Sequence, residues 1–290
     1  MEFLAPTTWA DALAVRQEHP DALALTGGTD VMVEINFDMR RPPASLDLTG
    51  VRELSDWSRD GDVVRLGAGV TYTRVIEELG DVLPGLAMAA RTVGSPQIRN
   101  RGTVGGNLGA ASPAGDSHPP LLAGGAEVEL ASVEGTRTVP IEEFYTGVKQ
   151  HAGRPDELIS AILVRSPSGP QQFSKIGTRN AMVISVSAFG LALHPDEQRI
   201  GTGIGSAAPT PRRAVEAESF LSSALDDLGL WESRGALPDS LTREFGDRVK
   251  AAASPIDDVR GTAAYRLHSL AVMARRTLTW AWADYAGGIT

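Results

Sequence analysis

Helical and extended patterns alternate along the first 55 residues of the chain. Thr8, followed three residues later by Asp11, forms a weak capping box, which predicts a helix over about 9–18. The apolar run at 22–25 predicts a short strand that leads directly into a glycine pair. Further short apolar segments follow at 31–35 and, after two prolines, at 45–48. We therefore expect a small α/β unit at the N-terminus.

The pattern changes after residue 55, where hairpin signals become frequent. Asp60-Gly61, between two apolar segments, is typical of a hairpin turn. A second hairpin is predicted from strands over 126–131 and 136–139, which turn at Glu134-Gly135. Between the two hairpins, we expect helices over 71–79 and 83–91, followed by a long glycine-rich segment at 94–109. A strand over 158–164 ends this part of the chain.

A break at 166–170, Ser-Pro-Ser-Gly-Pro, marks a natural domain boundary. Strand-like runs follow at 184–193 and 200–207, and helical patterns begin at Pro211. The last segment, 265–285, has apolar residues at helical spacing. The residues thus predict an α/β cofactor domain over 1–168, with subdomains of about 1–55 and 56–168, and a smaller α+β domain over 169–290.

The amino-acid composition and the net charge exclude several classes of protein. The chain has 290 residues, no cysteine, five scattered histidines and a net charge of −9. Without cysteine it forms no disulfide, binds no iron–sulfur cluster through thiolates and builds no cysteine zinc site. No Lys/Arg run suggests nucleic-acid binding, and no apolar run approaches the ~18 residues of a membrane span. The first residues do not resemble a secretory signal, so we expect a cytoplasmic protein with small-molecule or protein partners.

Several common catalytic and nucleotide-binding motifs are missing from the sequence. No Gly-Lys dipeptide supports a Walker-type phosphate loop, and no Gly-x-Ser-x-Gly nucleophile elbow occurs. Gly67-Ala68-Gly69 follows a predicted strand and resembles the start of a dinucleotide fingerprint. However, Tyr72 stands where that fingerprint requires a third glycine or alanine for close helix–strand packing.

Two glycine-rich segments remain as candidates for ligand binding. The first, residues 25–30, is Leu-Thr-Gly-Gly-Thr-Asp, and the second, residues 99–109, contains Gly102, Gly105, Gly106 and Gly109. Glycine lets a backbone approach a phosphate and adopt the positive φ angles of an anion-binding nest. Thr29, Thr103 and Asn107 add polar side chains, and Arg99 and Arg101 add positive charge. Glycine pairs are also ordinary turns, so the residues alone indicate only a phosphorylated ligand.

The second segment is more specific than its glycines. Residues 94–107, GSPQIRNRGTVGGN, and 111–116, ASPAGD, closely resemble the signature of the FAD subunits of xanthine and carbon monoxide dehydrogenases. The first segment resembles the AGGTD element of that family, with Thr26 in place of alanine. Residues 207–212 and 265–268 resemble its C-terminal domain, so the likeness spans nearly the whole chain. The GGTD form and the C-terminal pattern resemble bacterial xanthine dehydrogenase FAD subunits more than carbon monoxide enzymes.

The resemblance implies a fold and a set of partners. The fold is α+β (α/β) of the vanillyl-alcohol-oxidase/PCMH type, with two α/β subdomains clasping FAD and a C-terminal domain of three antiparallel strands and helices. Partner subunits of the family hold the molybdenum cofactor (a large subunit) and two [2Fe–2S] clusters (a small subunit), in assemblies expected to be dimers of heterotrimers. A chain without cysteine fits that division of cofactors.

The resemblance also assigns cofactor contacts, and no catalytic residue. Its first FAD loop corresponds to Leu25, Thr26, Gly27, Gly28, Thr29 and Asp30. Its second corresponds to Thr103, Gly105, Gly106 and Asn107. Asp116 matches an aspartate on the adenosine side, Ile159 a strand position near the flavin, and Lys175 a lysine close to the isoalloxazine ring. The alternatives left open are a helix cap for Asp30, an Asx turn for Asp116, strand core for Ile159 and a solvated lysine for Lys175.

Two further positions qualify these assignments. The loop containing Arg179, Asn180 and Met182 departs from the acidic loop of animal xanthine dehydrogenases, so it does not indicate how NAD⁺ would approach. His118 lies two residues from Asp116, which suggests a catalytic dyad, but a surface or fully hydrogen-bonded histidine is favoured.

The resemblance implies an electron relay: electrons from the molybdenum site pass through the iron–sulfur clusters to FAD, and from FAD to NAD⁺ or another acceptor. An FAD subunit of a carbon monoxide, aldehyde or N-heterocycle dehydrogenase is an alternative within the family. A stand-alone flavin oxidoreductase, such as one like UDP-N-acetylenolpyruvoylglucosamine reductase, and a non-catalytic phosphometabolite-binding module are alternatives outside it.

Overall fold

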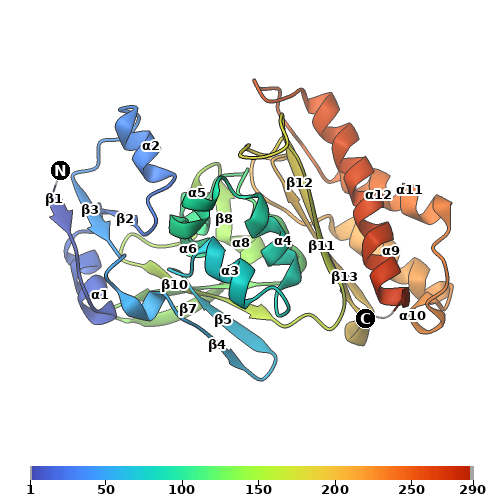
Figure 1. Ribbon diagram of the computed structural model, residues 1–290, viewed down its shortest axis with the longest axis horizontal. Coiled ribbons are helices and arrows are strands. Elements are labelled where there is room, and N and C mark those ends of the chain that lie inside the picture. Colours follow the sequence, from blue (N-terminus) through green and yellow to red (C-terminus); the bar gives the residue numbers. More distant parts are fainter. Residues whose placement is uncertain (1, 288–290) are drawn as a thin grey trace.

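In the computed structural model, which describes residues 2–287, the N-terminal segment folds around a parallel three-stranded sheet of order β1-β3-β2 (Figure 1). Its elements are β1 (Glu2–Leu4), α1 (Trp9–Glu18), β2 (Leu23–Leu25), α2 (Val31–Asn36), β3 (Ala44–Asp47) and the 3-10 turn Arg52–Leu54. Thr8 caps α1 as predicted, because its hydroxyl accepts a hydrogen bond from the Asp11 amide. The Asp11 carboxylate accepts from the Thr8 hydroxyl and not from the Thr8 amide, so the capping box is incomplete. The apolar run after the glycine pair is helical, and none of the residues of α2 is buried.

A five-stranded antiparallel sheet of order β4-β5-β10-β6-β7 forms the middle of the molecule. Its strands are β4 (Trp57–Asp60), β5 (Val63–Gly67), β6 (Glu127–Ser132), β7 (Gly135–Pro140) and β10 (Leu158–Arg165). Around it lie α3 (Tyr72–Glu78), α4 (Pro84–Thr92), α5 (Pro96–Arg101), α6 (Val104–Ala110), α7 (His118–Ala123), α8 (Ile141–Phe144) and the short β8 (Tyr145–Gly147) and β9 (Gln150–His151). Both predicted hairpins are present.

The C-terminal part is an antiparallel three-stranded sheet of order β11-β12-β13, with a helical layer on one side (Figure 1). Its elements are β11 (Gln171–Ile176), β12 (Ser187–His194), the 3-10 turn Pro195–Glu197, β13 (Arg199–Gly205), α9 (Val215–Asp227), α10 (Leu230–Ser233), α11 (Asp239–Ala251) and α12 (Ala263–Gly287). The other side receives the fully buried α7: a Cβ on Gly203 would lie 2.1 Å from the Pro119 carbonyl oxygen. This contact joins the sheet tightly to the middle of the molecule.

The glycine-rich segment at 94–109 is not a loop. Ser95 caps α5 and Thr103 caps α6, so that most of the segment is helical. The resemblance correctly implied the three-stranded sheet, although the residue pattern alone indicated only two of its strands. Within residues 2–287, the structure contains no helix that could span a membrane.

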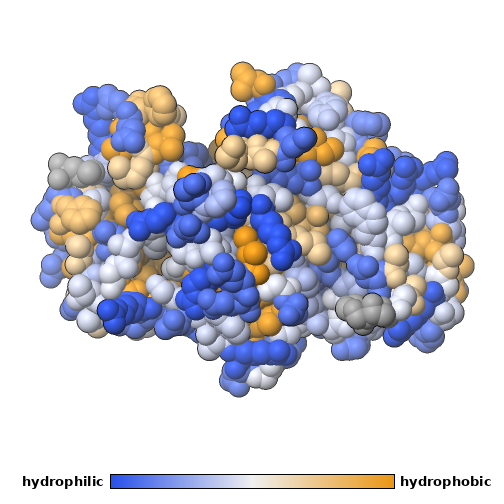
Figure 2. Space-filling model, viewed as in Figure 1, coloured by the Kyte–Doolittle hydropathy of each residue, from blue (hydrophilic) through white to orange (hydrophobic). Residues whose placement is uncertain are grey.

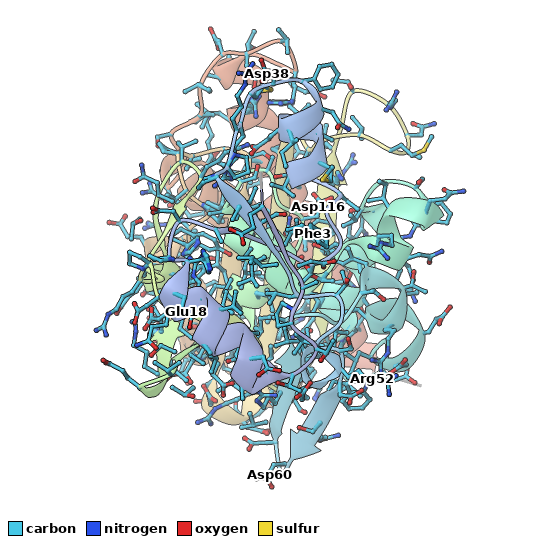
Figure 3. The ribbon with its side chains drawn as sticks, turned by 90° about the vertical axis from the view of Figure 1, so that its left-hand side faces the viewer. Phe3, Glu18, Asp38, Arg52, Asp60 and Asp116 are labelled. Atoms are coloured by element: carbon cyan, nitrogen blue, oxygen red, sulfur yellow. The ribbon has the colours of Figure 1, made fainter. Side chains whose placement is uncertain are left out.

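Hydrophobic side chains gather over α2 at the upper left of the surface view (Figure 2). The exposed ones there are Met32, Val33, Phe37 and Met39. Figure 3 shows α2 and the residues that follow it from the left-hand side of Figure 1, with Asp38 at the top of the view and Asp116 below it.

Candidate functional site: a cleft between two glycine-rich segments

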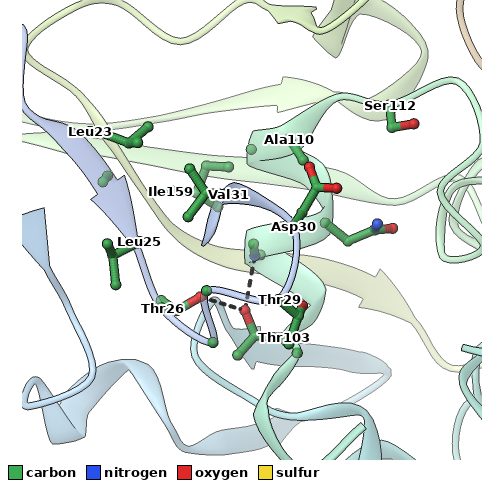
Figure 4. Close-up of a pocket in the computed structure, with 18 of the residues that line it drawn as sticks. Leu23, Leu25, Thr26, Thr29, Asp30, Val31, Thr103, Ala110, Ser112 and Ile159 are labelled. Atoms are coloured by element: carbon green, nitrogen blue, oxygen red, sulfur yellow. Dashed lines mark hydrogen bonds between the residues drawn. The ribbon is translucent and has the colours of Figure 1, made fainter. Parts of the chain in front are cut away.

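A cleft of about 1240 Å³ runs between the N-terminal sheet and α6. Residues from 20–34 and 40–43 line one side, and residues from 102–116 line the other. The hairpin β8–β9, β10 and the loop at 182–184 contribute further lining. The fold therefore brings the two glycine-rich segments, which are about 75 residues apart in the chain, onto facing walls of one cavity (Figure 4). Twelve of the thirteen cofactor-contact candidates line it, and Lys175 does not.

The first segment leaves β2 and turns sharply into α2. Gly28 has a φ of +71°, the left-handed conformation that glycine adopts without strain. Gly27 allows a close approach, because a Cβ there would lie 1.9 Å from the Arg101 carbonyl oxygen. Asp30 occupies the N-cap position of α2, yet its side chain makes no capping hydrogen bond. The alternative that the Asp30 side chain caps α2 is therefore not supported by a hydrogen bond.

Within the described part of the chain, the backbone N–H groups of residues 27–30 donate to no protein acceptor. Four consecutive free amides on the wall of a cleft form the kind of anion-binding surface that a diphosphate requires. The side chain of Thr29 also lies at this wall (Figure 4).

The second glycine-rich segment, residues 99–109, does not offer a run of free backbone amides to the cleft as the first segment does. Gly105 and Gly106 are helical, and only Gly28 among the four predicted glycines has a positive φ. The Gly105 amide donates to the Ala68 carbonyl at 3.2 Å, and the Gly106 amide donates to the Thr103 hydroxyl at 2.9 Å. The prediction that amides at 105–106 point at a phosphate is therefore corrected, because both are already hydrogen-bonded within the protein.

Gly105 and Gly106 are instead required by close packing. A Cβ on Gly105 would lie 2.5 Å from the Ala68 Cβ. A Cβ on Gly106 would lie 3.0 Å from the hydroxyl oxygens of both Thr103 and Thr26. These two hydroxyls are hydrogen-bonded to one another at 2.9 Å across the cleft (Figure 4), so the two glycine-rich segments are joined directly.

The side chain of Asn107 has a buried oxygen that lacks a hydrogen-bond donor among residues 2–287. Its side-chain oxygen Oδ1 is buried and has no hydrogen-bond partner in the described part of the chain, although the residue lines the cleft. A buried carbonyl oxygen without a donor costs free energy, so a ligand hydroxyl or amine is expected to supply one. The chemistry of this atom suits a ligand hydroxyl or amine better than a phosphate oxygen, which cannot donate.

Asp116 and Lys175 contact each other in a buried polar cluster. Lys175 Nζ lies 2.5 Å from Asp116 Oδ2, and each side chain is only 8% exposed. The carboxylate also accepts from the Thr92 and Ser185 hydroxyls, both at 3.2 Å. Burial raises the pKa of Asp116, against the opposing effects of Lys175 and the two hydroxyls. Lys175 is thus not a solvated lysine, and Asp116 forms an inter-segment ion pair rather than an Asx turn.

The other expected positions fall at the edges of the cleft. Ile159 lies at a bulge in β10, is partly buried and packs against two of the hydrophobic cores. His118 is fully buried and behind the cleft wall, so it is neither a surface residue nor part of a dyad with Asp116. In the loop after β11, Met182 lines the rim while the guanidinium of Arg179 bonds to the Met182 carbonyl of the same loop.

The sequence did not single out several residues that line the cleft. Ser112, Ala114 and Gly115 lie within the quoted ASPAGD motif, which was a usable signal. The hairpin β8–β9 and the Lys149–Glu34 ion pair at the rim had no recognisable signal in the sequence.

Known proteins of one family are similar to this chain along nearly its whole length. Residues 1–167 match the family described as FAD binding domain in molybdopterin dehydrogenase, and residues 172–281 match the CO dehydrogenase flavoprotein C-terminal domain. The putative xanthine dehydrogenase FAD-binding subunit of Escherichia coli (strain K12) is 32% identical, over 97% of this chain and 95% of that protein. The nicotinate dehydrogenase FAD-subunit of Eubacterium barkeri is 32% identical, over 77% and 80%. A structure of carbon monoxide dehydrogenase from Hydrogenophaga pseudoflava superposes with a TM-score of 0.88 at 26% identity, over 98% of this chain and 97% of that one.

Proposed function

The chain belongs to the family of FAD-binding subunits of molybdenum hydroxylases, and from that premise we propose that it passes electrons from a partner's iron–sulfur clusters, through FAD, to NAD⁺ or another acceptor. Its complex would then be an oxidoreductase of the xanthine dehydrogenase type, assembled with a molybdenum-cofactor subunit and an iron–sulfur subunit. The two subdomains, about 1–55 and 56–168, would clasp the cofactor, and 169–290 would form the C-terminal domain.

The observation that supports this proposal is the chemistry of the cleft walls. Free amides at 27–30 suit the two negative charges of a diphosphate, whereas the partnerless Oδ1 of Asn107 suits a hydroxyl of the ribityl chain or an adenine amine. FAD carries all of these groups on one molecule. The donors and acceptors that the cleft leaves unsatisfied therefore match those that FAD would bring.

Within this proposal, the residues of the chain bind and orient the cofactor. Gly27, Gly28 and Thr29 would hold the diphosphate, with Leu25, Thr26 and Asp30 beside it. Thr103, Gly105 and Gly106 would set the distance between the two walls, and Asn107 would fix a hydroxyl. Asp116, backed by Lys175, and Ile159 would line the rest of the cofactor. When bound, FAD would supply the capacity to accept single electrons and release two together.

No side chain of the cleft needs to act as an acid or base in this proposal. Among the residues that the structure describes, His151 is the one histidine in the cleft lining, and burial lowers its pKa. Its Nδ1 accepts a hydrogen bond from the Gly153 amide at 3.1 Å, which further commits it to a structural role. A stand-alone flavin enzyme would need its own proton donor, and the bonding of His151 commits it to another role.

The first test is the cofactor content of the purified chain. We expect a yellow protein whose acid-released flavin is FAD, in about one equivalent. A colourless protein that binds FAD neither on purification nor on titration would contradict the proposal and favour a phosphometabolite-binding module. Co-purification with subunits that carry molybdenum and iron–sulfur clusters, followed by flavin reduction when the hydroxylation substrate is added, would separate a relay subunit from a stand-alone enzyme.

Asn107→Ala is expected to weaken FAD binding by about 1–3 kcal/mol, because the variant removes a buried group that the cofactor would satisfy. The measurement is the FAD dissociation constant, from quenching of flavin fluorescence. Asn100→Ala is the matched control, since Asn100 makes an exposed hydrogen bond with Thr73 and does not line the cleft. Equal dissociation constants for Asn107→Ala and the unmodified chain would exclude the assigned role.

A further inference from the structure

Residues 112–116 form a turn that lines one wall of the cleft, between α6 and α7. The Ser112 carbonyl accepts from the Gly115 amide at 3.0 Å, with Pro113 at the second position, as in a β-turn. The Pro113 carbonyl accepts from the Ser206 amide at 2.8 Å. The Ser185 hydroxyl lies 3.4 Å from the Ala114 carbonyl oxygen and 3.2 Å from Asp116 Oδ1, and its one proton is shared between these two acceptors. The outer side of the turn is therefore held by residues that flank strands β12 and β13 of the C-terminal sheet.

The inner side of the turn is held by one imidazole. His118 is fully buried, its Nε2 lies 3.0 Å from the Ser112 carbonyl oxygen and its Nδ1 lies 2.6 Å from the Tyr145 hydroxyl. A carbonyl oxygen only accepts, so Nε2 must carry the proton and Nδ1 must accept from Tyr145. Burial lowers the pKa of His118 to about 3, so the ring stays neutral in this one tautomer.

The ring also sets how closely the turn packs. A Cβ on Gly115 would lie 2.2 Å from His118 Nε2 and 2.7 Å from Asn107 Oδ1. The turn, the partnerless oxygen of Asn107 and the edge of the imidazole thus meet at one point. Neither His118 nor Tyr145 lines the cleft itself, so any effect on a ligand must be transmitted through these neighbours.

Tyr145 extends the contact to another wall. It is buried, packs edge-on against the imidazole with ring centroids 4.7 Å apart, and is the first residue of β8. The hairpin that β8 begins contributes Thr146, Lys149 and His151 to the cleft lining. The His–Tyr hydrogen bond therefore connects the turn 112–116 to the hairpin 145–151. The Lys149 amide adds a second link, because it donates to the carbonyl of Ala111, just before the turn, at 3.1 Å.

We propose that His118 and Tyr145 form a positioning pair that fixes the turn 112–116, and with it Asn107, in the geometry that the cofactor requires. The proposal rests on the proposed FAD site. It states that this pair raises the affinity of the chain for FAD although neither side chain contacts the cofactor. Removing the imidazole would leave the Tyr145 hydroxyl buried without its acceptor, and the Ser112 carbonyl without one of its two donors. The turn would then be free to sink toward the vacated space.

The test compares the FAD affinity of three variants by fluorescence titration of the flavin-free chain. His118→Leu, which loses both hydrogen bonds, should raise the FAD dissociation constant about 10- to 30-fold. Tyr145→Phe, which loses one, should raise it about 3- to 10-fold. His118→Gln keeps a donor that can reach the Ser112 carbonyl and should restore the constant to within about 3-fold of the unmodified chain.

A second buried histidine supplies the control for a purely structural effect. His194 is 7% exposed and its Nε2 lies 3.1 Å from the Ala123 carbonyl oxygen, but it does not line the cleft. His194→Leu should lower the melting temperature of the chain by about as much as His118→Leu does, and it should leave the FAD dissociation constant unchanged.

The outcomes separate this inference from the proposed function. If the unmodified chain binds FAD and His118→Leu binds it equally well, the positioning role is overturned while the proposed function stands. If His118→Leu and His194→Leu weaken FAD binding equally, the effect is general destabilisation and the positioning role is also overturned. If the unmodified chain binds no FAD, the proposed function itself fails. Should His118→Leu not fold, the near-isosteric Tyr145→Phe decides the question by the same comparison.

Discussion

Gly106→Val is expected to yield a purified chain that retains little flavin. A Cβ at this position would lie 3.0 Å from the hydroxyl oxygens of Thr26 and Thr103, and valine adds two further methyl groups. Either the threonine pair separates, with loss of the Thr103 cap on α6, or the methyls enter the cleft. Overpacking of this kind costs about 1–3 kcal/mol, so the FAD dissociation constant should rise about 100-fold at the upper end. The ratio of flavin to protein absorbance measures the loss.

Gly109→Ala is the matched control for that variant. Gly109 lies in the same helix and also lines the cleft, but a Cβ there would make only an ordinary contact, 3.6 Å from Ile159 Cδ1. Alanine is favoured over glycine in a helix by about 1 kcal/mol, so this variant should keep its flavin and unfold at a slightly higher temperature. A Gly106→Val chain with the full complement of flavin would show that the threonine contact does not shape the cofactor site.

The expected effect at Gly106 has a different cause from the one that the sequence suggested. The glycines of the second segment resembled an anion-binding loop, yet the segment is helical and its amides are bonded. The signals for this were present: Ser95 before Pro96, and Thr103 three residues before Gly106, are N-cap patterns. Packing of Gly105 against Ala68 then stabilises a helix that glycine alone would disfavour.

Elements with local signals were predicted well from the sequence. Thr8 and Thr71 mark helix starts because each side chain accepts a hydrogen bond from the backbone three residues later, a pattern that lies within four residues of sequence. β11 carried no such signal. Its sequence, Gln-Gln-Phe-Ser-Lys-Ile, is mostly polar, because Gln171 and Lys175 bond to other parts of the protein instead of facing solvent.

Long-range pairing could not be predicted from residue patterns. The resemblance placed Asp116 and Lys175 near the cofactor separately, whereas the structure shows them bonded to one another across 59 residues of sequence. His118 illustrates the same limit: its two partners, Ser112 and Tyr145, come from a local turn and from a hairpin 27 residues away. Only the packing of α7 between two sheets brings these groups together.

The ion pair at Asp116 leads to the largest expected effect on stability. Lys175→Met is expected to lower the free energy of unfolding by about 3–5 kcal/mol, because removal of one partner leaves the other charge buried and uncompensated. Urea denaturation of the flavin-free chain at pH 7.5 measures the change. Lys149→Met is the control: its ion pair with Glu34 is half-exposed and should be worth about 0–1 kcal/mol.

The pH dependence of Lys175→Met distinguishes a buried charge from simple loss of packing. Burial already raises the pKa of Asp116 in the unmodified chain, and loss of the lysine removes the largest opposing effect, so the pKa should rise further. A folded-state pKa above the unfolded value of about 3.9 means that the folded state binds the proton more tightly. Stability from this group is then greatest at low pH and is lost as pH rises through the folded-state pKa.

The destabilisation of Lys175→Met should therefore shrink between pH 7.5 and pH 5, as the aspartate takes up its proton. A loss of packing alone would give the same destabilisation at both values. The double variant Asp116→Asn with Lys175→Met removes the charge at every pH, so its stability relative to the unmodified chain should change little between pH 5 and 7.5. If the single and the double variant show the same pH dependence, then Asp116 is not the titrating group, and the ion pair does not hold the C-terminal sheet to the wall of the cleft.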